Sequence, residues 1–177
     1  MKKICSLIAF ALLATTATYA QDMSAHSMKA EDNKPLASPK DISKGAHVAV
    51  TYYQPSKKGR VIFGGLVPYG EVWRTGANNA TEITFNKDGM FGGKPVKKGT
   101  YSLFTIPNAK EWTVILNSQM GQWGSFKYDQ YKDKDVLRTT VPVKNVASSV
   151  EKFTITVESD VLIMVWDKTE VRVPMKF

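Results

Sequence analysis

The sequence predicts an all-β protein with a single antiparallel β-sandwich or jelly-roll-like domain. From His47 onward, apolar and polar residues alternate along short segments, which is the pattern of half-buried strands. Gly, Pro, Asn and Asp separate these segments, and such short spacers favour antiparallel pairing. No segment shows helical spacing over the length that a parallel crossover needs, so an α/β fold is disfavoured.

The N-terminus has the pattern of a secretory signal peptide. Lys2 and Lys3 precede an apolar run over residues 4–14, and small residues follow up to Ala20. We expect residues 1–20 to be removed by cleavage near Ala20, which predicts a periplasmic or secreted protein. The run is shorter than the roughly 20 apolar residues of a membrane-spanning helix, so no transmembrane segment is expected in the mature form. Cys5 leaves with this segment, and the mature chain then forms no disulfide.

Residues 21–44 are predicted to form a flexible polar linker, because they contain two prolines, several charges and no aromatic residue. Met23, His26 and Met28 are suitable donors for copper or nickel, but chance explains their proximity better in so short a segment. We therefore expect no metal site. The net charge of +8 is the excess of 24 lysines and arginines over 16 carboxylates, and the lysines are scattered among the carboxylates. This distribution predicts a solvated surface and no binding to nucleic acid.

The domain is expected over residues 45–177, with about eight or nine strands. The alternating segments cover residues 48–52, 83–85, 100–106, 112–117, 136–143, 153–157, 161–166 and 171–175. Asp88-Gly89 and Gly92-Gly93 are typical of hairpin turns. Residues 121–135 form a long irregular connection, for which a short helix or an ordered flap is expected. Trp112 and Trp166 lie within strand patterns and are expected in the core.

The main candidate site is the glycine-rich segment 54–81, QPSKKGRVIFGGLVPYGEVWRTGANNAT. Its arginines offer planar donors for a carboxylate, phosphate or sugar hydroxyl, its asparagines offer amides, and aromatic rings here and in residues 121–135 offer stacking faces. The predicted ligand is a saccharide, a cell-wall fragment or a small anion. The candidate ligand-binding residues are Arg60, Tyr69, Trp73, Arg74, Asn78, Asn79 and Trp123. In the structural alternative, Arg74 pairs with Glu71 or Glu82 and covers Trp73.

Catalysis is left open by the sequence. His47 is the only histidine of the domain, and no G-x-S-x-G, phosphate-binding or cofactor-binding motif occurs, so no cofactor is expected. A hydrolase that uses Glu71 or Glu82, with an arginine stabilising negative charge, is one alternative function. A structural or interaction role with an envelope component is another.

Several adjoining motifs resemble one known family. Besides residues 54–81, they are GTYSLFTIP at residues 99–107, WTVILN at residues 112–117 and GQWGSF at residues 121–126. In these motifs, over residues 38–177, the chain resembles the secreted bacterial domain of unknown function 2911 family. The resemblance implies an exported β-rich domain without an established activity, and a signature that holds Arg60, Trp73, Arg74, Gly76, Asn78 and Thr81. Where this chain reads GANNAT, the family often reads GANEAT, so Asn79 replaces a carboxylate.

Overall fold

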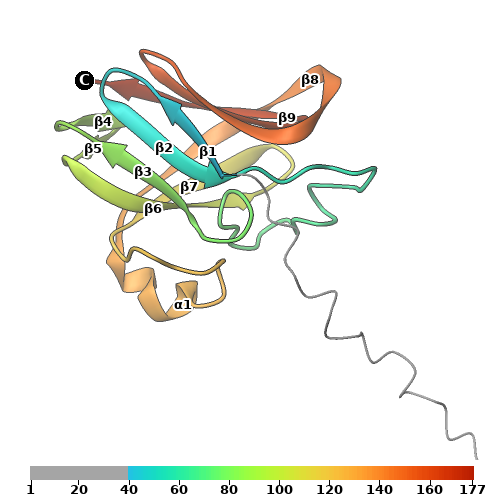
Figure 1. Ribbon diagram of the computed structural model, residues 1–177, viewed down its shortest axis with the longest axis horizontal. Helices are drawn as coiled ribbons and strands as arrows, with labels where there is room; N and C mark the ends of the chain where they lie inside the picture. Colours follow the sequence, from blue (N-terminus) through green and yellow to red (C-terminus); the bar gives the residue numbers. More distant parts are fainter. Residues whose placement is uncertain (1–39) are drawn as a thin grey trace, which may run out of the picture. The chain divides into compact units, whose positions relative to one another are not determined.

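A computed structural model describes residues 40–177 of the chain (Figure 1). The predicted signal peptide, the residues Met23, His26 and Met28, and all of the expected linker before Lys40 lie outside the described residues. The fold below is that of residues 40–177 alone.

The fold is all-β, as predicted, and every pair of neighbouring strands is antiparallel. One continuous 9-stranded sheet has the order β1-β2-β3-β6-β7-β8-β9-β4-β5. The strands are β1 (Lys40–Lys44), β2 (Val48–Tyr53), β3 (Thr81–Phe85), β4 (Gly89–Phe91), β5 (Lys94–Val96), β6 (Gly99–Pro107), β7 (Glu111–Asn117), β8 (Asp135–Val157) and β9 (Val161–Lys176).

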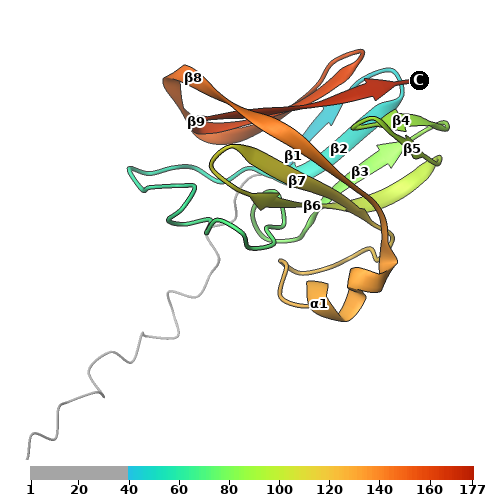
Figure 2. The same ribbon diagram turned by 180° about the vertical axis from the view of Figure 1, so that it is seen from behind.

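The sheet turns back over itself through the two long strands β8 and β9. The first part of β8 pairs with β7 as far as Pro142, and from Val143 onward the strand pairs with β9. In Figures 1 and 2, β8 and β9 arch over the layer that contains β1, β2, β3, β6 and β7. The result is a sandwich-like arrangement in which one strand belongs to both layers.

The length of β8 and β9 differs from the sequence expectation. Residues 136–143 and 153–157 are parts of the same 23-residue strand, and residues 161–166 and 171–175 are parts of one 16-residue strand. The polar residues between these segments do not form a turn. The pairing between β8 and β9 instead shifts register between Asn145 and Val150 and again between Val150 and Thr154, which lets the strands bend without ending.

Strand β1 lies in the segment expected to be linker. It forms because Lys40–Lys44 pairs along the whole of β2, and because its side chains reach the opposite layer. The Ser43 hydroxyl accepts a hydrogen bond from the Val157 amide at 2.9 Å. Asp41 accepts a hydrogen bond from the Tyr52 hydroxyl at 2.7 Å, and the same hydroxyl accepts one from the Ile155 amide at 3.1 Å. These bonds hold together the edges of the two layers.

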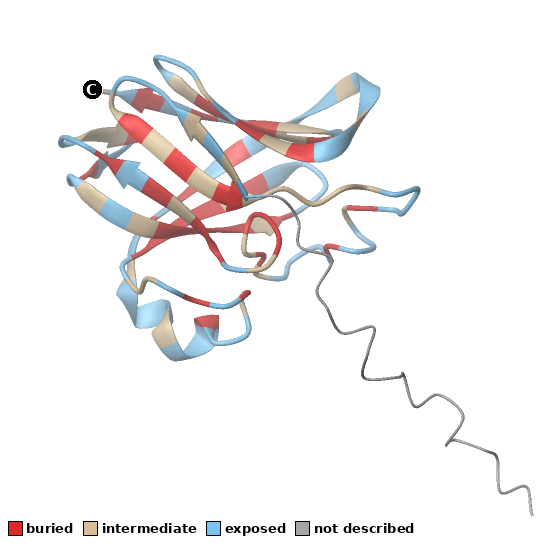
Figure 3. Ribbon diagram, viewed as in Figure 1, coloured by how far each residue is buried: buried red, intermediate tan, exposed pale blue. Residues whose placement is uncertain are grey.

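The core lies between the two layers, where alternate residues of strands such as β2 and β3 are buried (Figure 3). Trp112 and Trp166 are each 1% exposed, which confirms the expectation that they belong to the core. Burying such large aromatic side chains stabilises the fold by removing apolar surface from water. A second, smaller group on the other face of the β6–β7 layer is called the outer cluster below. It consists of Ala80, Phe104, Ile115 and Tyr128, with Val72 and Ile106 packed against it.

The connection after β7 contains the only helical turns within residues 40–177, α1 (Tyr128–Tyr131) and the 3-10 turn η1 (Lys132–Lys134). The expected short helix is therefore present. In Figures 1 and 2 it lies on the side of the β6–β7 layer away from β8 and β9. Within the described residues, no helix has the length and apolar character that crossing a membrane requires.

Candidate functional site

The long connection between β2 and β3 first covers one end of the core. Ile62 and Val67 are buried in the core cluster, and the ring of Phe63 packs edge-on against Trp112 at a centroid distance of 4.8 Å. The backbone of this part reaches β8, since the Lys57 amide donates to the Glu151 carbonyl at 2.7 Å and the Phe153 amide donates to the Pro55 carbonyl at 2.9 Å. We call this first half of the connection, residues 55–67, the plug.

Arg60 stabilises the plug through hydrogen bonds to the backbone of its own loop. Its Nε donates to the Lys57 carbonyl at 3.0 Å, and one terminal nitrogen donates to the Ser56 carbonyl at 2.7 Å. The residue is exposed, so part of its guanidinium also faces water. Its main described contacts close its own loop.

Trp73 lies in the core and does not present a ring to solvent. It is 6% exposed, its ring stacks on Trp166 at 6.0 Å, and it meets Phe153 edge-on at 4.9 Å. Its indole nitrogen donates to the Gly76 carbonyl at 3.1 Å. The contacts of Trp73 anchor this loop to the core.

The segment after Trp73 has an unusual backbone. Thr75 has a φ of 55° and Asn78 a φ of 55°, in the left-handed region that is costly for a β-branched residue such as threonine. Thr75 is completely buried, and its carbonyl accepts a hydrogen bond from the Thr81 hydroxyl at 2.6 Å. Its own hydroxyl lies 3.1 Å from that of Thr105. Surrounding contacts hold this strained turn in place, and such strain is concentrated at ligand and active sites in proteins.

Arg74 stands immediately before this turn. Trp73 and Thr105 exchange two backbone hydrogen bonds of 2.7 and 2.9 Å in an isolated antiparallel bridge, and Val72, on the other side of Trp73, packs against the outer cluster. Because Trp73 points into the core, alternation directs Arg74 to the outer face. Its own carbonyl accepts a hydrogen bond from the Thr81 amide at 3.1 Å, which ties it to the start of β3.

The guanidinium of Arg74 is partly buried and has no described counterion. Among residues 40–177 no carboxylate forms an ion pair with it, so the pairing with Glu71 or Glu82 that the structural alternative proposed is absent. Its Nε is buried and has no hydrogen-bond partner among the described residues. Burial lowers the pKa of the Arg74 guanidinium below its ordinary value, because removal from water disfavours the charged form. A cation in this setting is costly unless something compensates it.

The flap, defined here as residues 121–134, meets the turn directly. Asn79 and Trp123 form an isolated antiparallel bridge, the Ala80 amide donates to the Gln122 carbonyl at 2.9 Å, and the Gly124 amide donates to the Asn78 carbonyl at 3.1 Å. The two segments that the sequence singled out separately therefore lie side by side.

The exposed groups at this junction are polar and aromatic. Trp123 is 57% exposed, whereas Tyr69, which is 47% exposed, lies earlier in the connection with its ring against Gly64 and has no described contact with this junction. Asn79 is exposed and Asn78 is half-buried. Of the seven candidate residues, the structure therefore joins Arg74, Asn78, Asn79 and Trp123 through backbone contacts, whereas Trp73 belongs to the core and Arg60 to the plug.

Sequence reasoning missed the residues that hold the flap. Asn117 is completely buried, and its side-chain nitrogen donates to the Tyr131 carbonyl at 2.7 Å and to Asp135 at 2.8 Å. Asp135 also accepts hydrogen bonds from the Tyr128 hydroxyl at 2.5 Å and from Arg138 at 3.0 Å. Burial and the Asp135 carboxylate raise the pKa of Tyr128 above its ordinary value. An asparagine that ends an apolar strand was the only available signal.

Gln122 was also missed. It is 8% exposed, and its side-chain nitrogen donates to the Gln119 carbonyl at 3.0 Å. Its side-chain oxygen is buried without a partner among the described residues. Gln122 of the flap and Arg74 thus each have one buried polar atom without a partner among residues 40–177.

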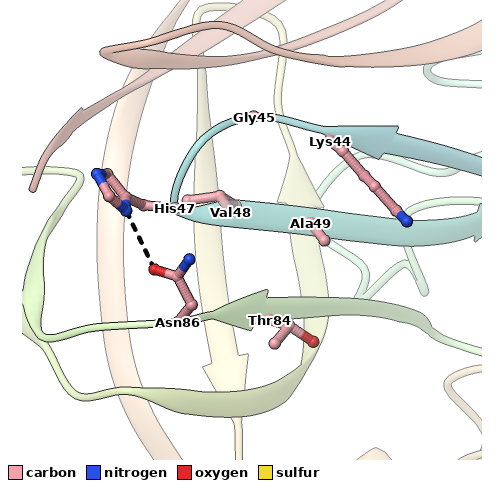
Figure 4. A pocket seen from close by; sticks show the side chains of 7 residues that line it. All are labelled: Lys44, Gly45, His47, Val48, Ala49, Thr84 and Asn86. Carbon is pink, nitrogen blue, oxygen red and sulfur yellow. Dashed lines mark hydrogen bonds between the residues drawn. The ribbon is translucent and has the colours of Figure 1, made fainter.

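A small hollow of about 100 Å³ lies elsewhere, at the turn between β1 and β2 (Figure 4). Lys44, His47 and Asn86 contribute side chains to it, and His47 Nδ1 lies 3.1 Å from the side-chain oxygen of Asn86. The ring of Phe177 also lies against His47, at a centroid distance of 5.8 Å. The histidine is therefore engaged by neighbouring side chains, and the hollow includes none of the candidate residues.

The two candidate carboxylates of the hydrolase alternative form no ion pair within residues 40–177. Glu71 is exposed in the loop, while Glu82 lies on β3 in register with Ser102 and Thr51. No group of three or more His, Cys, Asp or Glu side chains within residues 40–177 is arranged to hold a metal ion.

Comparison with known proteins identifies a family and nothing closer. No curated protein and no solved structure is significantly similar to this chain. Residues 34–175 match the family described as protein of unknown function (DUF2911). The matched residues include the plug, the strained turn, the flap and nearly all strands. The chain therefore belongs to the DUF2911 family.

Proposed function

We propose that the protein binds a small anionic group of a polar ligand through Arg74, on the outer face where residues 74–81 meet the flap. The observation that carries the proposal is the partly buried guanidinium of Arg74, which has no carboxylate partner among residues 40–177. A ligand carboxylate or phosphate would supply the missing counterion.

The backbone around Arg74 supports this role. The turn that follows it is strained at Thr75 and is held by buried hydroxyl contacts to Thr81 and Thr105. A rigid backbone keeps a side chain in place before the ligand arrives, so less conformational entropy is lost on binding. Arg74 presents parallel donors that match the oxygen pair of a carboxylate or the oxygens of a phosphate.

The neighbouring groups suit a polar ligand. Asn78 and Asn79 supply amide donors and acceptors beside the same turn, and neither has a described side-chain hydrogen bond within residues 40–177. Saccharides, cell-wall fragments and small anions all offer matching groups. We also propose, from the N-terminal pattern of residues 1–20, that binding takes place outside the cytoplasm.

The hydrolase alternative has no comparable support. Its candidate carboxylates, Glu71 and Glu82, have no described hydrogen bond to a histidine, serine or arginine side chain within residues 40–177. We therefore propose binding without a chemical step.

The test compares Arg74→Gln with Arg60→Gln. Both changes remove one guanidinium from the same connection, but Arg60 already donates to two carbonyls of its own loop. Acetate and inorganic phosphate serve as probes, with binding followed by shifts of backbone amide signals in two-dimensional NMR. We expect saturable shifts at residues 74–81 in the wild type, loss of at least tenfold in affinity in Arg74→Gln, and little change in Arg60→Gln.

Two outcomes would contradict the proposal. One is the absence of saturable shifts at residues 74–81 of the wild type with either probe. The other is an Arg74→Gln variant that remains folded, as judged by its dispersed amide signals, and binds as tightly as the wild type.

A further inference from the structure

We infer that the anionic group belongs to a sugar, and that Trp123 is the surface on which the sugar ring stacks. This inference rests on the proposed anion site at Arg74 and specifies the ligand as an acidic saccharide.

Trp123 differs from the other tryptophans of the chain. Trp73 is 6% exposed and both Trp112 and Trp166 are 1% exposed, whereas Trp123 is 57% exposed. The three buried rings pack against one another and against Phe63 and Phe153 in the core. An exposed indole keeps a broad apolar face in water, and that face is suited to the C–H groups on one side of a pyranose ring.

The exposure of Trp123 does not come from a loosely held loop. Both neighbours are fixed by backbone hydrogen bonds, Gln122 to Ala80 at 2.9 Å and Gly124 to Asn78 at 3.1 Å. The residue itself forms a bridge with Asn79. A fixed aromatic ring loses little conformational entropy when a ligand stacks on it.

The same contacts connect Trp123 to the anion site. The Thr81 amide donates to the Arg74 carbonyl. The amide of the preceding residue, Ala80, donates to the carbonyl of Gln122, which precedes Trp123. Residues 79–81 thus contact both, Arg74 through the Thr81 amide and Trp123 through the bridge with Asn79. A single ligand with a charged group and a ring can use both.

Charge argues for a soluble saccharide over an anionic membrane surface. The flap and the residue after it, residues 121–135, contain Lys127, Lys132 and Lys134, but also Asp129, Asp133 and Asp135. Three lysines and three aspartates cancel, whereas attachment to anionic lipid requires an excess of basic residues. A small ligand whose one anionic group binds Arg74 does not depend on such an excess.

The experiment measures the affinity of the full chain for acetate and for two acidic sugars, glucuronate and N-acetylmuramate. Acetate has the carboxylate without the ring, and glucose, as a fourth probe, has the ring without the charge. Binding is followed by the indole N–H signal of Trp123 and by the amide signals of residues 74–81. The variants are Trp123→Ala, Phe126→Ala and Arg74→Gln.

Phe126 provides the matched control, because it lies on the same flap and is 80% exposed but has no described contact with residues 78–80. We expect at least one acidic sugar to bind the wild type more tightly than acetate, by about fivefold, and glucose to bind more weakly than that sugar. Trp123→Ala should remove this advantage and leave acetate binding unchanged. Phe126→Ala should retain it, and Arg74→Gln should weaken every charged probe.

The outcomes separate the two proposals. If acetate, glucuronate and N-acetylmuramate all fail to bind the wild type, the anion site itself is refuted. If acetate binds at residues 74–81 but neither sugar binds more tightly, or if Trp123→Ala keeps the sugar advantage, the anion site remains and the saccharide inference is overturned. Equal losses from Trp123→Ala and Phe126→Ala would indicate a general apolar docking surface and would also overturn it.

Discussion

The indole nitrogen of Trp73 donates a hydrogen bond to the carbonyl of Gly76 at 3.1 Å. This bond joins the core to the strained turn, because the ring that makes it is packed against Trp166 and Phe153 while the carbonyl belongs to the residue after Thr75. Arg74 lies between Trp73 and Gly76 in the sequence, so its position depends on how the core packs around Trp73.

A first prediction compares Trp73→Phe with Trp112→Phe. Both changes remove similar buried volume, but Trp112 has a buried nitrogen without a hydrogen-bond partner among the described residues. Trp73→Phe should cost about 1 to 3 kcal/mol more of the free energy of unfolding, because it leaves the Gly76 carbonyl buried and unpaired. Chemical denaturation measures the difference, and equal losses would show that the bond contributes nothing.

A second prediction concerns the residue that holds the flap. Asn117→Ala removes the donors to Tyr131 and Asp135, and should lower the free energy of unfolding by about 2 to 4 kcal/mol, since several buried groups lose their partners. Hydrogen exchange of the flap amides should accelerate more than that of β2 and β3. Ser118→Ala is the control, because the exposed Ser118 makes one bond of 3.2 Å to Lys134. If the flap amides exchange at similar rates in Asn117→Ala and Ser118→Ala, Asn117 does not hold the flap.

A third prediction follows from Tyr52. Burial raises the pKa of its hydroxyl from 10.0 to about 12, and the Asp41 carboxylate adds to this effect. Because the folded pKa lies above the unfolded one, this stabilisation is fully present below pH 10.0 and is lost as the pH rises toward about 12. Tyr52→Phe should therefore show a shallower loss of stability over that interval than the wild type. Denaturation at several pH values tests this, and parallel slopes in the two proteins would refute it.

A fourth prediction uses the turn at Lys58. Its φ is 49° and that of Gly59 is 70°, and the Lys58 side chain is exposed. Lys58→Gly should raise the free energy of unfolding by about 0.5 to 1 kcal/mol, because relief of the left-handed strain exceeds the entropy that glycine adds to the unfolded chain. Lys87→Gly, at an exposed lysine without positive φ, should instead be neutral or destabilising. Thermal unfolding distinguishes the two, and a destabilised Lys58→Gly would contradict the argument.

Much of the strand pattern could be predicted from sequence, because alternation of apolar and polar residues is a local property. Strands β2, β3, β6 and β7 and the Gly92-Gly93 turn between β4 and β5 lie where the alternation and the glycines predicted them, whereas Asp88-Gly89 is not a hairpin turn, because β3 and β4 do not pair. Strand β1 could not be predicted in this way. Its stability depends on pairing with β2 and on the contact of Ser43 with Val157 of the opposite layer, 114 positions away in the sequence.

The candidate site was predicted only in part, for the same physical reason. Residues 74–81 and the flap were both singled out, but their contact through Asn79 and Trp123 depends on how the chain returns after β7. Whether Arg74 has an acidic partner also depends on which side chains the sheet brings to its outer face. Nearby glutamates in the sequence suggested an ion pair that the folded chain does not form.

Local pattern alone was enough to predict an all-β chain with antiparallel neighbours, because strand alternation and turn residues act over a few positions. Only the tertiary structure decided which aromatic side chain faces water. Trp73 and Trp123 both stand in irregular, glycine-containing segments, yet one is 6% exposed and the other 57%. The difference arises because β8 and β9 fold back over Trp73, whereas the described residues leave much of the Trp123 ring uncovered.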